Sequence, residues 1–324
     1  MKLRLIALGL FVATTPLHAA SVVTLPTSDV AAISSSGMIA GQALDMNGNS
    51  WAAVGSGSSW KALKVSGFDS TTANCTYGSW TGGGASSYAT FTQVPVIWDA
   101  NGTPTVISMM DGEVTGIGAD KAAVTLYDMN YNPWPYEYVI SQKKLVQLAV
   151  PSGFSGGWTA GVSETGPGMI AGTVVGTNTT QAILWNGGLQ PKPIGAFASG
   201  VESQGVAVNG GAQFVGTYFK PDGTGGSFYW DSLNGMRGLA WTGGYVEMES
   251  LNASGAVVGT YWRNNGTQTA IVYSVARGLM MLPQTDATYN IVDARSINDS
   301  GVIVGRAYKT DGIFAHPVTV ERLP

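Results

Sequence analysis

Histidine and cysteine are nearly absent from this chain. Among 324 residues there are two histidines, His18 and His316, and one cysteine, Cys75. A single cysteine cannot form a disulfide within the chain, and the same counts exclude metal sites built from cysteine or histidine. A serine–histidine–aspartate triad would depend on His316, because His18 belongs to an N-terminal segment that we interpret below as removed. We therefore expect His316 to be a structural residue.

Charge is scarce as well. Charged residues make up 11% of the chain, and 20 acids against 16 bases give a formal net charge of -4. The lysines and arginines are scattered, which argues against a nucleic-acid partner because phosphate binding requires clustered positive charge. Glycine, by contrast, is abundant at 45 residues, together with valine, threonine, tyrosine and tryptophan. This composition is typical of an all-β protein.

Long hydrophobic runs are missing. Residues 1–20 have a basic start at Lys2 and Arg4, a short apolar run from Leu5 to Val12, and small residues at Ala19 and Ala20. This pattern predicts a cleaved signal peptide, and with it export to the periplasm or the extracellular space. No later run approaches the ~18 apolar residues of a transmembrane helix, so we expect no transmembrane segment.

A repeat organises the remaining sequence. The stretch SINDSGVIVG at residues 296–305 returns in altered form at residues 252–259, 209–216, 165–172 and 34–41. Each copy is followed by a polar turn, an apolar run, a tight turn and a second short apolar run, which predicts four antiparallel strands per unit. An anchor residue in the third strand recurs every 42 to 45 residues, at Val54, Trp98, Ile140, Trp185, Trp230, Tyr273 and Val318.

Seven units of four strands at this period are the signature of a β-propeller. We predict one domain, residues 21–324, forming a seven-bladed β-propeller of four-stranded antiparallel blades. The mature N-terminal strand, Val22 to Pro26, would close the ring as the outer strand of the last blade. A membrane β-barrel is the alternative architecture, although it should repeat per hairpin, at about half this period. Asn265-Gly266 predicts a type I′ hairpin turn.

The first strand of each unit is expected to lie innermost. In five units the residue two positions before the turn that ends this strand is small, and the residue after it is large and apolar. We expect this pattern because only small side chains fit where the blades converge. The small residues are Ala32, Gly116, Ala207, Ser250 and Ser296, and the apolar ones are Ile33, Ile117, Val208, Leu251 and Ile297.

Two pieces of the repeat resemble the HAF-type extracellular repeat family of bacterial exported proteins. The first is residues 297–305 (INDSGVIVG), and the second is residues 182–188 (AILWNGG), which residues 227–231 (SFYWD) also match. The resemblance covers about five of the seven units. It implies export and a propeller-like fold, and it implies no reaction and no catalytic residue.

Acidic residues recur at the start of the innermost strands. Counting five positions back from the turn gives Asp29, Glu113, Gln204, Glu247 and Asp293, so four of five aligned units carry an acid. In a propeller these positions would ring the mouth of the central channel. They predict a cation site or an acidic funnel for a polar ligand, and the alternative is that strand starts near solvent simply tolerate acids.

Two turns resemble partial calcium loops. They begin at Asp45 (DMNGN) and at Asp128 (DMNYN), and they place oxygen ligands at alternate positions. Both lack the downstream bidentate glutamate of an EF-hand, and hairpin turns favour these residues in any case. Weak calcium binding is therefore one interpretation and turn chemistry is the other; no further cofactor is expected.

The hairpins between second and third strands should share one face with the linkers between blades. Aromatic residues on that face offer platforms for sugar rings or protein partners. They are Trp134, Tyr136, Trp158, Trp241 and Tyr245. We expect an exported binding or interaction module for a glycan or a protein. The alternatives are an extracellular glycan-active hydrolase that uses paired carboxylates on this face, and a structural envelope or matrix component.

Overall fold

The computed structural model describes residues 22–186, 191–195, 201–282, 289–309 and 315–320. The predicted signal segment, residues 1–20, and the pair Gly187-Gly188 of the repeat lie outside these ranges. Every regular element in the described ranges is a β-strand, and the ranges contain no helix long and apolar enough to cross a lipid bilayer.

The first sixteen strands are β1 (Val22–Thr24), β2 (Asp29–Ile33), β3 (Ile39–Leu44), β4 (Ser50–Ser56), β5 (Ser59–Leu63), β6 (Ser70–Tyr77), β7 (Trp80–Ser87), β8 (Thr92–Trp98), β9 (Pro104–Val106), β10 (Gly112–Ile117), β11 (Lys121–Tyr127), β12 (Pro133–Val139), β13 (Lys144–Gln147), β14 (Gly156–Val162), β15 (Ile170–Gly176) and β16 (Thr179–Trp185). The remaining twelve are β17 (Pro191–Pro193), β18 (Glu202–Val208), β19 (Phe214–Phe219), β20 (Gly225–Asp231), β21 (Gly235–Leu239), β22 (Gly244–Leu251), β23 (Val257–Arg263), β24 (Gln268–Ser274), β25 (Gly278–Met281), β26 (Tyr289–Ile297), β27 (Ile303–Lys309) and β28 (Ala315–Val320).

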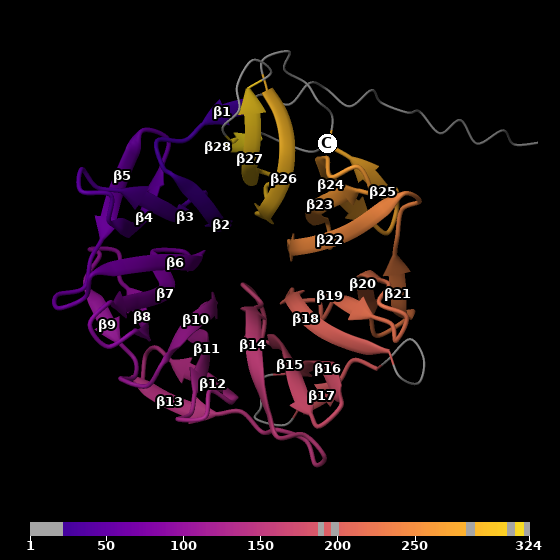
Figure 1. The fold of residues 1–324 in the computed structure, drawn as a ribbon, viewed down its shortest axis with the longest axis horizontal. Helices are drawn as coiled ribbons and strands as arrows, with labels where there is room; N and C mark the ends of the chain where they lie inside the picture. Colours follow the sequence, from indigo (N-terminus) through magenta and orange to yellow (C-terminus); the bar gives the residue numbers. More distant parts are fainter. Residues whose placement is uncertain (1–21, 187–190, 196–200, 283–288, 310–314, 321–324) are drawn as a thin grey trace, which may run out of the picture.

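These strands form seven separate four-stranded antiparallel sheets arranged in a ring (Figure 1). Blades 1 to 6 are consecutive meanders, from β2–β5 to β22–β25, and blade 7 combines β26–β28 with β1. The predicted seven-bladed propeller is confirmed. It includes units two and three, β6–β9 and β10–β13, in which the sequence repeat is weakest. Six of the seven anchors lie in third strands, and Ile140 lies directly after β12.

The N-terminal strand closes the ring as predicted. Val22 pairs with Val320 and Thr24 with Val318, so β1 is the outer strand of blade 7. Leu25, which follows it, is buried with Val30 of blade 1 and Val304 of blade 7. First and last blades are therefore joined by hydrogen bonds and by a shared apolar cluster.

The chain direction gives the ring two different faces. The hairpin face carries the hairpins between second and third strands and the linkers between blades, and the turn face carries the turns that end the innermost strands. In the hairpin of residues 263–266 the Gly266 amide donates to the Arg263 carbonyl (2.9 Å). Of these four residues, Gly266 alone has a positive φ. The prediction of a type I′ turn there is wrong, since that turn needs positive φ at both central residues.

Every innermost strand carries a β-bulge near its middle, and this explains the repeated glycine of the second strand. In blade 6 the register shifts between Met248 and Ser250. Opposite this bulge, a Cβ on Gly259 would lie 2.0 Å from the Glu247 carbonyl oxygen; in blade 7, a Cβ on Gly305 would lie 2.2 Å from the Asp293 carbonyl oxygen. Glycine leaves room for these two carbonyls, whereas blade 3 carries Val124 at the equivalent position.

Turn asparagines link neighbouring blades at the turn face. Asn209 Nδ2 donates to the Asn252 carbonyl (2.9 Å), Asn252 Nδ2 to the Asn298 carbonyl (3.1 Å), and Asn298 Nδ2 to the Ser34 carbonyl (3.3 Å). All three asparagines are buried. The repeated asparagine thus serves both its own turn and the next blade.

The core lies between blades, as the small-then-large pattern predicts. The five apolar residues of that pattern are buried, and the five small residues line the space along the ring axis. A Cβ on Gly116 would lie 2.6 Å from the Val162 amide nitrogen of the next blade. The innermost strands are therefore too close together for larger side chains.

Candidate binding site in the axial pocket

A pocket of about 530 Å³ lies between the innermost strands. The bulge residue of every blade lines it: Ala31, Asn74, Thr115, Ala160, Val206, Glu249 and Arg295. A bulge turns an extra residue out of the ladder, so the seven bulges supply one side chain each to the pocket wall. The two charged members, Glu249 and Arg295, come from neighbouring blades 6 and 7.

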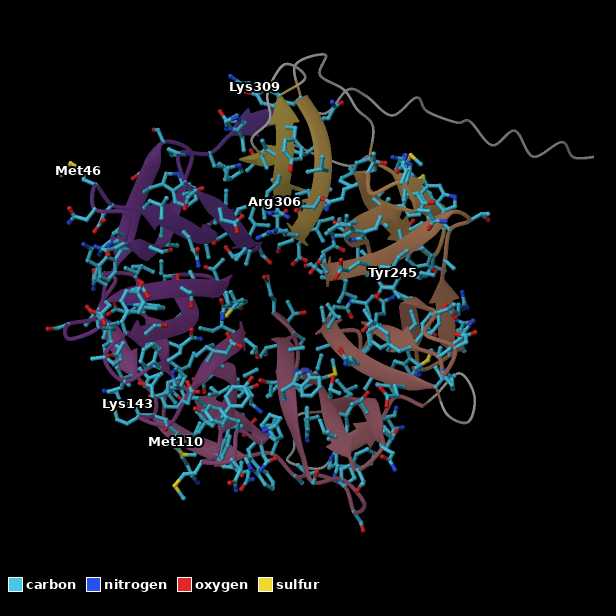
Figure 2. The ribbon with its side chains drawn as sticks, in the orientation of Figure 1. Met46, Met110, Lys143, Tyr245, Arg306 and Lys309 are labelled. Atoms are coloured by element: carbon cyan, nitrogen blue, oxygen red, sulfur yellow. The ribbon has the colours of Figure 1, made fainter. Side chains whose placement is uncertain are left out.

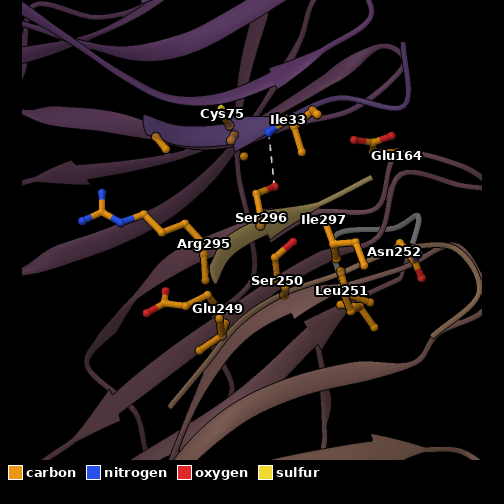
Figure 3. A pocket seen from close by; sticks show the side chains of 18 of the residues that line it. Ile33, Cys75, Glu164, Glu249, Ser250, Leu251, Asn252, Arg295, Ser296 and Ile297 are labelled. Atoms are coloured by element: carbon orange, nitrogen blue, oxygen red, sulfur yellow. Dashed lines mark hydrogen bonds between the residues drawn. The ribbon is translucent and has the colours of Figure 1, made fainter. Parts of the chain in front are cut away.

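Figure 3 shows how these side chains are distributed along the pocket. The ends of Glu249 and Arg295 extend toward one end, and Glu164 and Asn252 lie toward the other. Ser250 and Ser296 lie between them, and the Ser296 hydroxyl accepts a hydrogen bond from the Ile33 amide of blade 1 (3.2 Å). The chain direction makes the first end the hairpin face and the second the turn face.

Both arginines of the pocket are already bound to acids. Asp293, which is 4% exposed, accepts hydrogen bonds from the Arg306 backbone amide (2.7 Å) and from its Nε (2.5 Å). Arg295 donates from Nη1 to Asp29 Oδ2 (3.0 Å) and to the Val30 carbonyl (2.9 Å), and its Nε lies 3.6 Å from Asp293 Oδ2. These contacts leave little positive charge for a ligand.

Glu247 and Glu249 supply the negative charge that remains. Glu247 Oε2 accepts a hydrogen bond from the Trp262 indole (2.8 Å), which holds the carboxylate at the hairpin-face end. Desolvation, reinforced by the charge of Glu247, raises the pKa of Glu249 to about 7. Glu249 still keeps part of its surface open to the pocket. A part of the Glu249 carboxyl groups is therefore charged near neutral pH.

The turn-face end carries a second acidic group. The Ser35 hydroxyl of blade 1 donates to Glu164 Oε2 of blade 4, and it lies 3.1 Å from Asp299 Oδ2 of blade 7. Because blades 1 and 4 are not neighbours, this contact crosses the ring axis. Desolvation raises the pKa of Glu164, and the nearby Asp299 charge adds to the effect.

The four acids predicted to ring the channel mouth have different surroundings. Glu247 and Asp293 line the pocket together. Asp29 is bound to Arg295 at its edge, and Glu113, on blade 3, accepts a hydrogen bond from Asn74 of blade 2 (2.9 Å). Desolvation raises the pKa of Glu113. The structure thus brings Glu247 and Asp293 together in the pocket, whereas the carboxylates of Asp29 and Glu113 are bound by side chains of neighbouring blades. That any of the four binds a ligand stays a prediction.

The predicted aromatic residues are spread around the ring and are half-buried. Trp241 packs against Tyr261 with ring centroids 5.3 Å apart, and Tyr136 packs against the core of blade 3. Trp158 lies on the innermost strand of blade 4, and the Trp134 indole lies 3.4 Å from Asp128 Oδ2. Tyr245, labelled in Figure 2, lies on β22, the strand that also carries Glu247 and Glu249. Desolvation, followed by the charges of Glu247 and Glu249, raises its pKa to about 12.

Asp45 and Asp128, the two weak calcium candidates, brace their own turns. Asp45 Oδ1 accepts the amides of Asn47 (2.9 Å) and Asn49 (3.0 Å), and its Oδ2 accepts the Trp51 indole (2.9 Å). Asp128 accepts the equivalent set from the turn that follows it. Within the described ranges no three acidic, histidine or cysteine side chains gather as a metal site. Calcium binding stays a prediction.

Sequence reasoning missed Glu249, Arg295, Arg306 and Trp262. The bulge explains the first two, because it shifts the pocket-facing position to one residue before the small residue of the repeat. Aligning the seven units on that position would have shown the seven bulge residues together. Arg306 and Trp262 lie on second strands, where the repeat carries no marker for the pocket.

Neither a protein-family model nor a curated protein sequence matches this chain. Several solved structures match its fold. The propeller domain of the Trilobed protease from Pyrococcus furiosus, titled as having an open velcro topology, is 10% identical, with 95% of each chain covered and a TM-score of 0.58. Oligogalacturonate lyase from Vibrio parahaemolyticus is 12% identical, with 94% of this chain and 97% of that chain covered and a TM-score of 0.58.

TolB from Acinetobacter baumannii is 13% identical, with 89% of this chain and 81% of that chain covered and a TM-score of 0.50. The likeness to all three is one of fold. It confirms the propeller and leaves function to the residues of the pocket and the hairpin face.

Proposed function

We propose that the protein is an exported binding module that accepts a positively charged group of its ligand at the hairpin-face end of the axial pocket. The observation that carries this proposal is the charge left over in the pocket. Five carboxylates and two arginines line it, and both arginines are bound to acids. At the hairpin-face end Glu247 and Glu249 are therefore left to attract a cation, while Glu164 and Asp299 lie at the turn-face end. A recessed site with low-dielectric walls strengthens that attraction.

The chemical group we favour is a primary ammonium. It carries three donors and one positive charge, which suits two neighbouring carboxyl groups. Such a group is offered by a lysine of a protein or by an amino sugar of a glycan, the two ligand classes expected from the sequence. The Trp262 ring, 39% exposed beside Glu247, adds an aromatic surface at the same mouth.

Calorimetric titration of the chain without its predicted signal segment tests the proposal. The ligands are a glucosamine tetramer, its N-acetylated counterpart, a lysine-containing peptide and the same peptide acetylated on lysine. The free-amine member of one pair should bind, and acetylation should abolish binding.

The double variant Glu247→Gln/Glu249→Gln should lose that binding. A charge-matched control, Glu202→Gln/Asp222→Asn, changes two acids outside the pocket and should bind like the wild type. Equal binding by both double variants would contradict the proposal.

A glycan-active hydrolase is the second candidate, favoured by one observation. Glu249, with a pKa near 7, lies beside the acid Glu247, and a protonated carboxyl near an ionised one is the pair that acid-catalysed glycoside cleavage requires. Release of reducing sugar from pooled polysaccharides, lost in Glu249→Gln, would support this candidate. A chain with neither binding nor hydrolysis would fit the structural envelope role.

A further inference from the structure

Two hairpins on the hairpin face share five of seven residues and the same pattern of hydrogen bonds to their aspartate. Residues 45–51 of blade 1 read DMNGNSW, and residues 128–134 of blade 3 read DMNYNPW. In both, the aspartate accepts the amides two and four residues later, the second asparagine side chain and the tryptophan indole. We call them the twin hairpins. Each presents a methionine at its tip.

The two methionines are fully exposed. Met46 and Met129 have exposed fractions of 104% and 99%, so neither side chain packs on its own blade. The turn does not need methionine, because the hydrogen bonds that hold it come from the flanking residues. A large apolar side chain kept in water on a rigid turn gains nothing for folding, and it is already ordered for insertion into a partner.

Blade 2, between the twin hairpins, carries further exposed apolar side chains. Its own hairpin carries exposed aromatic residues, and the linker from blade 2 to blade 3 carries two exposed methionines. We define the blade 1–3 patch as Met46, Tyr88, Phe91, Met109, Met110, Met129 and Tyr131. Figure 2 places Met46 and Met110 at the outer rim on this side of the ring. The patch is thus separate from the axial pocket.

The most exposed apolar side chains of the hairpin face lie on one arc. The patch residues are 45–104% exposed, whereas Phe219, Trp262, Met281 and Tyr308, on blades 5 to 7, are 38–41% exposed. The corresponding hairpin tips of blades 4, 5 and 6 are exposed and carry no large apolar side chain, at 177–179, 221–224 and 264–267. On the turn face, Leu233 and Val275 are the large apolar side chains exposed among described residues.

Acids surround the patch. Asp45 and Asp128 hold the twin hairpins, Asp69 Oδ2 accepts the Tyr88 amide (2.7 Å), and Asp111 Oδ1 accepts the Gln93 amide (2.9 Å). The pKa values of Asp45 and Asp128 are lowered, the first mainly by the Trp51 indole hydrogen bond and the second mainly by Asn132. These carboxylates are therefore ionised at neutral pH.

Positive charge is nearly absent from the same hairpins and linkers. Lys64 is their one basic side chain in the described part of blades 1 to 3, and it lies over the Trp51 ring, 4.2 Å from the centroid. A binding surface of this composition complements apolar sockets surrounded by positive charge.

We infer that the blade 1–3 patch is a docking surface for a protein that presents apolar sockets within a basic rim. The twin hairpins act as two rigid anchors with the tip of blade 2 between them. An anionic membrane is disfavoured as the occupant because the acids around the patch would be repelled from it.

A fluorescently labelled amphipathic peptide of leucine and lysine is the probe for this inference. It should bind the chain with an affinity that falls as salt is raised, and the Met46→Ser/Met129→Ser variant should weaken binding at least ten-fold. The matched control, Leu233→Ser/Val275→Ser on the turn face, should bind like the wild type. The pocket variant Glu247→Gln/Glu249→Gln should also bind normally, which separates this inference from the proposed function.

Several results would overturn the inference. A leucine–glutamate peptide that binds equally well would show that charge plays no part, and absence of peptide binding would show that no such surface exists. Equal loss in the turn-face control would mean non-specific adhesion. Binding to phosphatidylcholine or phosphatidylglycerol vesicles that is lost in the twin-hairpin variant would assign the patch to a membrane instead.

Discussion

Replacing Asn298 with alanine should destabilise the whole ring rather than one turn. Its Oδ1 accepts the amides of Ser300 (3.1 Å) and Val302 (2.9 Å), and its Nδ2 donates to the Ser34 carbonyl of blade 1 (3.3 Å). The variant therefore loses two bonds within the turn and one between the last and first blades.

The size of the effect follows from burial. Asn298 is 4% exposed, and the Ser34 residue that accepts its bond is fully buried. Each lost bond is worth about 1 kcal/mol, and a buried carbonyl left without its donor costs about 1–3 kcal/mol. We expect the free energy of unfolding to fall by about 3 kcal/mol. Asn298→Asp keeps the acceptor for the two turn amides but places a carboxylate oxygen against the buried Ser34 carbonyl, so it should lose at least as much stability as Asn298→Ala.

Urea unfolding followed by tryptophan fluorescence measures these losses. The matched control is Asn265→Ala, whose side chain accepts the Thr267 amide (3.1 Å) and the Thr267 hydroxyl (2.8 Å) within its own exposed hairpin. That variant should lose about 0.5–1 kcal/mol, the lower part of the range for a local hydrogen bond. If Asn298→Ala and Asn265→Ala were equally destabilised, the inter-blade role of the asparagine would be refuted.

Three further predictions concern the pocket and the closure of the ring. Glu249 has a folded-state pKa of about 7, against 4.5 for an ordinary glutamate. The unfolded chain therefore loses the proton first, and this group lowers stability as pH rises through that window. Glu249→Gln should raise the melting temperature above pH 7 and leave it unchanged below pH 4.5, and a uniform shift at all pH values would contradict this. Arg306→Gln should destabilise by about 3 kcal/mol in urea unfolding, because it leaves Asp293 buried with a weakened partner; a loss under 1 kcal/mol would show that Asp293 is not held by this pair. Deleting residues 22–25 removes β1 and buried Leu25, so unfolding free energy should fall by at least about 3 kcal/mol, with association through the exposed β28 edge visible in size-exclusion chromatography. An unchanged monomer of wild-type stability would contradict the closure.

The fold was predictable because its constraints repeat. A small residue, such as Ser250 or Ser296, with a large one directly after it marks the convergence of blades in five units. An error in the prediction for one unit is therefore corrected by the others. The closing strand was predictable because the sequence of residues 22–26 (VVTLP) resembles that of residues 279–283 (LMMLP), the first three of which lie in the outer strand β25. Ile140 and the hairpin at Gly266 were placed less well, since turn geometry depends on local backbone detail.

The site was only partly predictable. Counting from the turn found Glu247 and Asp293, but a β-bulge changes the side that faces the pocket, and the sequence gives no direct sign of it. Asp29 and Glu113 were predicted as ligand groups, whereas Arg295 and Asn74 of neighbouring blades already bind them. Such contacts join residues about 40 to 270 positions apart in the chain, and only the closed ring brings them together.

Proton release on ligand binding tests the central claim most directly. The claim is that an ammonium group binds beside Glu249 and lowers its pKa from about 7. Titration of the ammonium ligand at pH 7, in two buffers with different ionisation enthalpies, should show release of part of one proton in the wild type and none in Glu249→Gln. Binding that releases no proton and is unaffected by Glu249→Gln would contradict the account.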